Sequence, residues 1–335
     1  MIKLLVTIPN GIVKDTFIPP RARAALEALG EVTWNNTDAE YTEDELCELL
    51  ADKDVCVTGW YTHRLTERAL HKATRLRLVA HTAASVAPIV SDALFLRGIR
   101  VVSGNNGFAE CVAEGVIAYI LAALRELPRY DSLMRSGGWK TPDYYNRSLL
   151  GKSIGLLGFG AIARYLCPML LPFRVKICAY DPYVSPEEMA RYHVTPCTME
   201  QALMCQIVSV HLPETESTRH ILNAEKLAII QDGALFVNTA RGAVVDEAAL
   251  ITELQTGRFA AALDVYEQEP LPAESPLRAL PNALLVPHMG GPTVERRGDV
   301  TLLIAEDIAR FFANEALLHE ITQAHAQGMS HYEKK

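Results

Sequence analysis

A glycine-rich turn near the middle of the chain constrains its fold more than any other feature. Residues 153–157 form a short apolar run, and Gly158-Phe159-Gly160-Ala161-Ile162-Ala163 joins this run to a segment of helical periodicity. In a G-x-G-x-x-A turn the first glycine makes a tight turn, the second lets the backbone approach a pyrophosphate, and the small last residue allows close helix packing. The pattern predicts a strand, a turn and a helix whose N-terminus binds a dinucleotide.

Asp181 favours this interpretation over that of a plain tight turn. It ends the next apolar run, near the offset of about 20 residues at which a carboxylate accepts hydrogen bonds from ribose hydroxyls. Its charge would repel a 2′-phosphate, and the following Pro182-Tyr183 supplies no cation to neutralise one. We therefore expect NAD rather than NADP as the cofactor.

Short apolar runs alternate with helical segments along most of the chain. The runs lie at 4–8, 54–59, 76–80, 99–102, 153–157, 175–180, 207–211, 234–238, 260–263 and 283–286. Strands that helices cover on both sheet faces read as continuous apolar runs, so parallel sheets are expected. Capping boxes at Thr42 and Thr198 mark helix starts, and longer helices are expected at 109–125 and 293–312. The fold class is α/β, with two Rossmann-like, doubly wound parallel-sheet domains.

Composition narrows the function classes. The 335 residues suit two domains, and 49% of them are hydrophobic, as in a globular protein. The net charge of −8 and the lack of a basic run exclude an electrostatic nucleic-acid footprint. Seven scattered cysteines without a C-x-x-C pair indicate free thiols, no zinc ribbon and no metal site. No uninterrupted apolar run reaches the length of about 18 residues that a membrane span needs, so we expect a cytoplasmic protein without a membrane partner.

Three side chains late in the chain have the chemistry for reducing a carbonyl group. Arg241 and Glu269 lie just beyond predicted strand ends, and His288 follows the last run, at the sheet edge where such folds bind ligands. Histidine ordinarily titrates near pH ~6.5 and can donate or accept a proton, while a carboxylate at its other nitrogen fixes its tautomer. The fork of an arginine matches a carboxylate. Taken singly, each residue also suits a plain loop or strand-end position.

The chain resembles the D-isomer-specific 2-hydroxyacid dehydrogenase family over nearly its whole length. The motifs that carry the resemblance are Leu150-Gly151-Lys152, Ala179-Tyr180-Asp181-Pro182-Tyr183, His211-Leu212-Pro213, Asn238-Thr239-Ala240-Arg241-Gly242, Asp264-Val265-Tyr266-Glu267-Gln268-Glu269-Pro270 and Pro287-His288-Met289-Gly290-Gly291. The resemblance implies a discontinuous substrate domain at 1–103 and 291–335 and an NAD-binding domain at 104–290. It also implies that Arg241, Glu269 and His288 are catalytic. A glutamate at 269 favours hydroxyacid chemistry over that of the related formate dehydrogenases, in which a glutamine is expected there.

The resemblance and the glycine turn together indicate which residues bind ligands. The expected cofactor-binding residues are Gly158, Gly160, Ala161, Ile162, Asp181, His211, Pro213, Thr239, Ala240, Arg241, Asp264, His288 and Gly290. The expected substrate-binding residues are Ala83, Ala84, Arg241 and His288, and the substrate is a small 2-hydroxy or 2-oxo acid. Asp264 is expected to support Glu269 or His288. The family also implies a homodimer.

Some features depart from the family pattern or leave alternatives open. The substrate loop at 81–87 has Ala83 and Ala84 where the family has glycines, which restricts positive φ and leaves the substrate unidentified. Arg174 stands where glycine is common. Tyr144 and Tyr145 either wall the cleft or serve packing. A dinucleotide-sensing protein without turnover, like the corepressors that resemble this family, is the alternative function.

Overall fold

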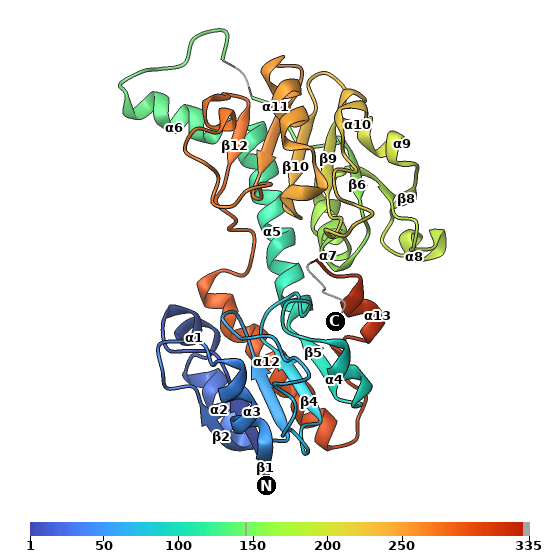
Figure 1. The fold of residues 1–335 in the computed structure, drawn as a ribbon. Helices are drawn as coiled ribbons and strands as arrows, with labels where there is room; N and C mark the ends of the chain where they lie inside the picture. Colours follow the sequence, from blue (N-terminus) through green and yellow to red (C-terminus); the bar gives the residue numbers. More distant parts are fainter. Residues whose placement is uncertain (145, 331–335) are drawn as a thin grey trace. The chain divides into compact units, whose positions relative to one another are not determined.

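The chain forms two compact units, each built on one parallel sheet. The computed structural model describes residues 1–144 and 146–330 (Figure 1). Unit 1 comprises Met1–Cys111 with Pro292–Lys335, and unit 2 comprises Val112–Gly291. The first division lies eight residues after the boundary expected at 103/104, and the second lies one residue after that expected at 290/291. The role of each unit stays a prediction. Tyr145, expected to line a cleft or to pack, lies outside the described residues.

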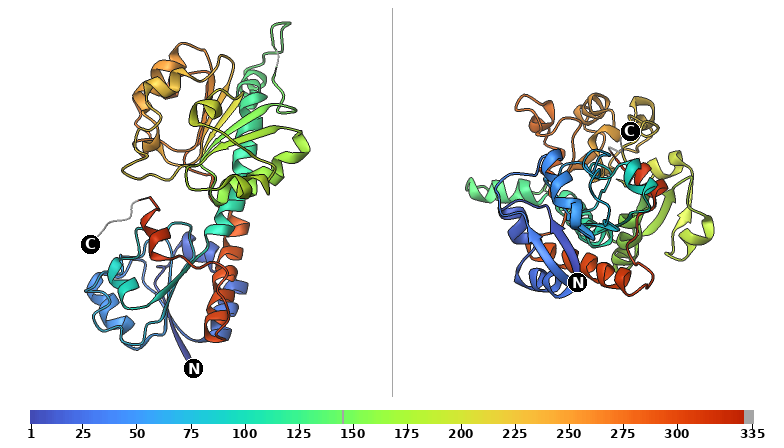
Figure 2. Two further views of the ribbon diagram at one scale, coloured as in Figure 1. Left: turned by 90° about the vertical axis from the view of Figure 1, so that its right-hand side faces the viewer. Right: turned by 60° about the horizontal axis from the view of Figure 1, so that its bottom comes forward.

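Unit 1 holds a five-stranded sheet with the strand order β2-β1-β3-β4-β5. Its strands are β1 (Ile2–Val6), β2 (Gly30–Trp34), β3 (Val55–Thr58), β4 (Leu78–His81) and β5 (Arg100–Ser103). Its helices are α1 (Ile12–Phe17), α2 (Pro20–Leu29), α3 (Glu43–Leu49), η1 (Leu50–Asp52), α4 (Asp92–Leu96), α12 (Val294–Phe312) and α13 (Gln323–Gln327). Helix α12 covers one face of the sheet, and α3 and α4 cover the other (Figure 2). Leu4 and Val6 of β1 accordingly face one core, and Leu5 faces the other.

Unit 2 holds a seven-stranded parallel sheet with the order β12-β11-β10-β9-β6-β7-β8. Its strands are β6 (Ser153–Leu157), β7 (Lys176–Tyr180), β8 (Thr195–Pro196), β9 (Ile207–Val210), β10 (Leu235–Asn238), β11 (Ala260–Leu263) and β12 (Ala283–Leu285). Its helices are α6 (Leu127–Arg135), α7 (Ala161–Leu170), η2 (Leu171–Phe173), α8 (Pro186–Ala190), α9 (Met199–Leu203), α10 (Ala224–Ala228), η3 (Gly242–Val244), α11 (Glu247–Gln255) and η4 (Pro276–Ala279). The strand order reverses between β6 and β9, and ligands bind at such a point in doubly wound sheets.

The two parallel sheets confirm the predicted fold class. Both capping boxes form: the side chain of Thr42 accepts from the Glu45 amide, and that of Thr198 accepts from the Gln201 amide. Two strands were not predicted, because β2 and β8 lie at sheet edges and lack a continuous apolar run. Arg174 adopts a left-handed φ of 56°, which explains why glycine suits its position.

Helix α5 (Asn105–Leu124) begins four residues earlier than the sequence pattern predicted and runs from unit 1 into unit 2. Within the described residues it is the one helix long and apolar enough to cross a membrane, by length and composition alone. The sequence analysis looked for an uninterrupted apolar run and did not find this helix, because Glu110 and Glu114 lie within the helix. In the fold, Val116, Ile120 and Leu124 of this helix are buried in the core on one face of the unit 2 sheet.

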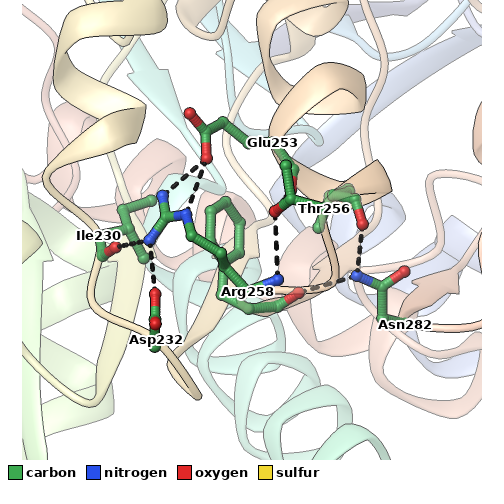
Figure 3. Close-up of polar contacts among 8 residues, drawn as sticks. Ile230, Asp232, Glu253, Thr256, Arg258 and Asn282 are labelled. Carbon is green, nitrogen blue, oxygen red and sulfur yellow. Dashed lines mark hydrogen bonds and ion pairs between the residues drawn. The ribbon is translucent and has the colours of Figure 1, made fainter.

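An arginine network closes the amino-terminal edge of the unit 2 sheet, opposite the strand ends that bind ligands in this fold. Arg258 lies just before β11 and donates to the Ile230 carbonyl at 2.6 Å, to Asp232 at 3.0 Å and to Glu253 at 2.6 Å (Figure 3). The side-chain Nδ2 of Asn282 donates to the Phe259 carbonyl at 2.8 Å and so joins the start of β12 to the same edge. Each polar group in this network has a partner, so the network is structural.

Candidate active site

The predicted cofactor turn has the geometry that pyrophosphate binding needs. Gly158 has a φ of 96°, and a Cβ atom there would lie 2.8 Å from the His211 carbonyl oxygen, so only glycine fits. A Cβ atom on Gly160 would meet nothing within 4 Å. Gly160 is the N-cap of the ten-residue helix α7 and has no capping side chain. The amides of Ala161 and Ile162 begin this helix, and the space before them is open to an anion.

Asp181 follows β7 and holds the turn in place. Its Oδ2 accepts from the Phe159 amide at 2.8 Å, and its Oδ1 accepts from the Tyr183 amide at 2.9 Å. Each carboxylate oxygen has two acceptor positions, so both retain capacity for a ribose hydroxyl. The residue therefore positions the glycine turn, while its contact with a ribose stays a prediction.

Two unsatisfied polar atoms lie at the same carboxyl edge of the sheet. Within 1–144 and 146–330, four buried side-chain polar atoms have no hydrogen-bond partner, and two of them are Nδ1 of His211 and Oγ1 of Thr239. Burial lowers the pKa of His211 to about 4, so its ring is neutral. An unpaired buried polar atom is costly, and a ligand with polar groups would satisfy both. With Pro213 exposed just after His211, these residues fit the cofactor expected here.

The loop after β10 presents Arg241. The buried Asn238 shapes this loop, since its Oδ1 accepts from the Ala240 amide and its Nδ2 donates to the Arg241 carbonyl, both at 3.0 Å. A Cβ atom on Gly242 would lie 1.9 Å from the Tyr266 backbone, so this glycine lets the loops after β10 and β11 touch. Burial lowers the pKa of Arg241, and the charges of Glu214 and Glu269 oppose that change. The guanidinium donates from Nη1 to the Ala240 carbonyl at 2.6 Å.

His288 and Glu269 form a direct pair. Nδ1 of His288 lies 2.6 Å from Oε2 of Glu269, and Oε1 of Glu269 accepts from the Tyr266 amide at 3.0 Å. The histidine adopts a left-handed φ of 53°, an unfavourable conformation that neighbouring contacts must hold. The side chains of His288 and Glu269 are 51% and 36% exposed, so substrate can reach them. The carboxylate fixes the ring so that Nε2 is the nitrogen available to a ligand.

Asp264, which is 1% exposed, anchors the backbone that carries the histidine. Its Oδ1 accepts from the Met289 amide at 2.7 Å, and its Oδ2 accepts from the Gly290 amide at 2.8 Å. The Tyr119 hydroxyl lies 3.4 Å from Oδ1. Burial and the adjacent Asp264 raise the pKa of Tyr119, so its hydroxyl stays a donor. Asp264 therefore supports His288, one of the two roles predicted for it.

The predicted substrate loop at 81–87 belongs to unit 1. Ala83 is buried and Ala84 is half-buried, and neither has a positive φ, as expected of alanine. The sequence analysis did not single out His81. It is 2% exposed, and its Nδ1 lies 2.9 Å from Oγ1 of Thr58. Burial lowers its pKa to about 4, with the Ser85 backbone opposing, and its position as the last residue of β4 was the available signal.

The structure brings the three predicted catalytic residues to one edge of the unit 2 sheet. The predicted cofactor residues also follow strands of this sheet, at their carboxyl ends.

A separate open hollow in unit 1 is lined by Asp44, Cys47, Glu48, Glu67, Arg68 and His71. Its arginine pairs with Asp44, so it lacks the reactive grouping described above. In the described part of the chain no three His, Cys, Asp or Glu side chains could hold a metal ion.

Known proteins share this sequence pattern. A family model described as "D-isomer specific 2-hydroxyacid dehydrogenase, NAD binding domain" matches residues 117–290. The chain is 32% identical to D-3-phosphoglycerate dehydrogenase of Methanocaldococcus jannaschii over 94% of its own length. It is 34% identical to hydroxypyruvate reductase of Thermotoga maritima over 81% of its own length and 89% of that protein.

The fold is shared as well. A crystal structure of a phosphoglycerate oxidoreductase from Rhizobium etli is similar with a TM-score of 0.80 and 25% identity, over 96% of this chain and 99% of that one. The chain spans 58% of the length of the Methanocaldococcus jannaschii phosphoglycerate dehydrogenase.

Proposed function

Because the chain belongs to the D-isomer-specific 2-hydroxyacid dehydrogenase family, we propose that it transfers a hydride between NAD(H) and a 2-hydroxy or 2-oxo acid of D configuration. The observation that carries this proposal is the distance of 2.6 Å between His288 Nδ1 and Glu269 Oε2, at an exposed strand edge. Binding of a dinucleotide does not require such an acid–base pair. This pair therefore favours an enzyme over a corepressor-like sensor.

His288 serves as the acid and base. When bound, the nicotinamide ring supplies or accepts the hydride. Reduction of a ketone places negative charge on its oxygen, and Nε2 of His288 holds the proton that neutralises that charge. Glu269 accepts the Nδ1 hydrogen, which keeps the ring in the tautomer and orientation that expose Nε2 and stabilises the ring when it is protonated.

Arg241 binds the carboxylate of the 2-oxo or 2-hydroxy acid substrate. Its planar fork can donate two parallel hydrogen bonds to the carboxylate of the substrate, and it polarises the adjacent carbonyl. The charges of Glu214 and Glu269 favour its protonated form despite burial. Ala83 and Ala84 are also proposed to contribute to substrate binding.

The cofactor site favours NAD over NADP. Gly158, Gly160, Ala161 and Ile162 would hold the pyrophosphate, Asp181 the ribose hydroxyls, and His211, Pro213, Thr239, Ala240 and Gly290 the remainder of the dinucleotide. A 2′-phosphate would meet the carboxylate of Asp181, which already accepts two backbone amides. Replacing Asp181 with serine should lower the preference for NADH over NADPH by tenfold or more.

The deciding experiment measures turnover. The purified chain is mixed with NADH and a panel of 2-oxo acids that includes glyoxylate, hydroxypyruvate, pyruvate, phenylpyruvate and 3-phosphohydroxypyruvate. We expect NADH oxidation with at least one of them, and oxidation in reverse of only the D enantiomer of the product. Micromolar NADH binding without turnover across the panel would overturn the proposal and favour the sensor.

Helix α6 and its following loop support a proposed homodimer. Within the described part of α6 no residue is buried, and Leu127, Met134 and Trp139 are more than half exposed. A second copy of the chain would cover these side chains. Light scattering should give twice the monomer mass, and Met134→Glu with Trp139→Ala should reduce that mass.

We also propose a cytoplasmic location. It is supported by the seven free thiols and can be tested by cell fractionation.

A further inference from the structure

Three cysteines from three different elements meet on one face of the unit 2 sheet. Cys178 is in β7, Cys197 follows β8, and Cys205 follows α9. The sulfur atoms of Cys178 and Cys205 lie 3.6 Å apart, and the Cys197 thiol is within hydrogen-bonding reach of Cys178. The proposed dehydrogenase mechanism uses none of these thiols.

The backbone brings these side chains together. A Cβ atom on Gly155 of β6 would lie 2.1 Å from the Ala202 carbonyl oxygen, so this glycine lets α9 approach the sheet. The turn after α9 is then fixed, since the Cys205 amide donates to the same carbonyl at 3.2 Å. On the neighbouring strands, Cys178 pairs in register with Gly155, and the Cys197 amide donates to the Ala179 carbonyl at 3.0 Å.

Solvent reaches this cluster from one side. Cys178 and Cys197 are half-buried, and Cys205 is buried. The neighbouring Cys178 and burial raise the pKa of Cys205, which therefore remains a thiol at neutral pH. Cys178 is the more accessible member of the close pair. It is level with Gly155, whereas the cofactor turn begins at Gly158.

We propose that Cys178 and Cys205 are an oxidation site, where hydrogen peroxide converts them into a reversible disulfide. The Cys178 thiol first loses its proton, and the thiolate attacks the peroxide, so that an S–O bond forms and the O–O bond breaks. The hydroxide that leaves takes up the released proton, and the products are sulfenic acid and one water. Cys205 then attacks that sulfur, an S–S bond forms, the S–O bond breaks, and the Cys205 proton leaves with the hydroxide as a second water. Two thiols lose two electrons, which reduce the peroxide.

The bond would join β7 to the turn before β9. Its cysteines are 27 residues apart, so the disulfide would close a long loop and restrict the unfolded chain. We expect oxidation to raise the Tm of the protein by several degrees. Because the site lies away from the carboxyl ends of the strands, turnover should change by less than about threefold.

The test uses the full, reduced chain. Hydrogen peroxide is added stepwise, free thiols are blocked with N-ethylmaleimide, and peptides are mapped by mass spectrometry with and without dithiothreitol. We expect the loss of two of the seven free thiols, a peptide pair linking Cys178 to Cys205 within one chain, and full recovery in dithiothreitol. Sulfinic acid on Cys178 without a link, or a dominant link from Cys178 to Cys197, would overturn the assignment.

Cysteine variants distinguish a disulfide between Cys178 and Cys205 from oxidation of other thiols. Cys205→Ser and Cys205→Ala should both abolish the link and the rise in Tm, while Cys47→Ser should leave both unchanged, because Cys47 is half-buried in unit 1. If the Cys205 variants still lose two free thiols when hydrogen peroxide is added, the proposal is wrong. These readouts do not depend on dehydrogenase activity, so the proposed function stands or falls separately.

Discussion

Gly290 lies against Asp264 with no room for a side chain. A Cβ atom on Gly290 would lie 2.7 Å from Oδ2 of Asp264, the oxygen that accepts the Gly290 amide at 2.8 Å. Gly290 lacks a positive φ, so this steric contact, not backbone strain, excludes alanine. We predict that Gly290→Ala displaces the carboxylate that anchors the loop behind His288. Because small misplacements of catalytic groups are costly, turnover should fall by about 10- to 100-fold in steady-state assays.

The control for this variant is Gly115→Ala in α5. A Cβ atom on Gly115 would lie 3.7 Å from the Gly290 Cα, an ordinary van der Waals distance. Alanine in a helix interior is more stable than glycine by roughly 0.5–1 kcal/mol, so this variant should be as active as the parent and no less stable. Equal activity of both variants and the parent would show that Asp264 does not position His288.

Arg241→Lys should weaken substrate binding. Lysine keeps the charge but loses the planar fork that matches a carboxylate, so kcat/KM for the 2-oxo acid should fall by about 10- to 100-fold. The matched control is Arg258→Lys, which alters the arginine at the opposite edge of the sheet. That variant should unfold at lower denaturant concentration, by about 1 kcal/mol in free energy of unfolding, with kcat/KM unchanged. If kcat/KM fell in Arg258→Lys and stayed unchanged in Arg241→Lys, Arg241 would not be the residue that binds the substrate.

The sequence was sufficient to predict both parallel sheets, because buried strands of such sheets are continuous apolar runs. It did not predict β2, whose run from Gly30 to Trp34 includes Glu31 and Thr33 and lies at a sheet edge. Strand β8 has two residues and ends in Pro196, which no periodicity can mark. Edge strands face solvent on one side, so burial does not impose an apolar pattern on them.

His81 makes the stability of the protein depend on pH. Its pKa is about 4 in the fold, where burial disfavours the charged ring, and near ~6.5 when unfolded. The unfolded chain therefore binds more protons between these values, so stability is fully present above pH ~6.5 and is lost as the pH falls toward 4. For one such histidine the loss between pH 8 and pH 5 is roughly 2 kcal/mol.

The variant His81→Asn isolates this contribution. Asparagine keeps a polar atom near Thr58 but does not titrate, so its free energy of unfolding should fall less than that of the parent between pH 8 and pH 5. Urea unfolding at both pH values gives the comparison. An equal acid-induced loss in parent and variant would mean that His81 is not held neutral by the fold.

Arg174 carries a local conformational cost. It is an exposed residue with a φ of 56°, a conformation that glycine adopts without steric strain. Arg174→Gly should therefore raise the free energy of unfolding by about 0.5–1 kcal/mol. Arg174→Ala also removes the side chain but keeps Cβ and should give no gain, so a similar gain in both variants would point to the arginine side chain instead.

The residues of the candidate site could be predicted from the sequence, but the contacts that hold them in position could not. Arg241, Glu269 and His288 stand in motifs at strand ends, so order along the chain was enough to group them. The contacts of Asp264 with Met289 and Gly290 depend on a loop conformation that no periodicity encodes. The departure at Ala83 was visible in the sequence, whereas the burial of His81, the first residue of the same loop, depends on contacts such as that with Thr58, which form only in the fold.

The most direct measurement compares the parent with His288→Gln at saturating NADH and the best 2-oxo acid. Glutamine preserves a polar side chain but cannot carry a proton between Nε2 and the substrate, so kcat should fall by about 10²- to 10⁴-fold. NADH binding, followed by fluorescence, should stay within about threefold of the parent, because the glycine turn and Asp181 are untouched. A variant that binds NADH and turns over at the parental rate would contradict the role of His288 as acid and base.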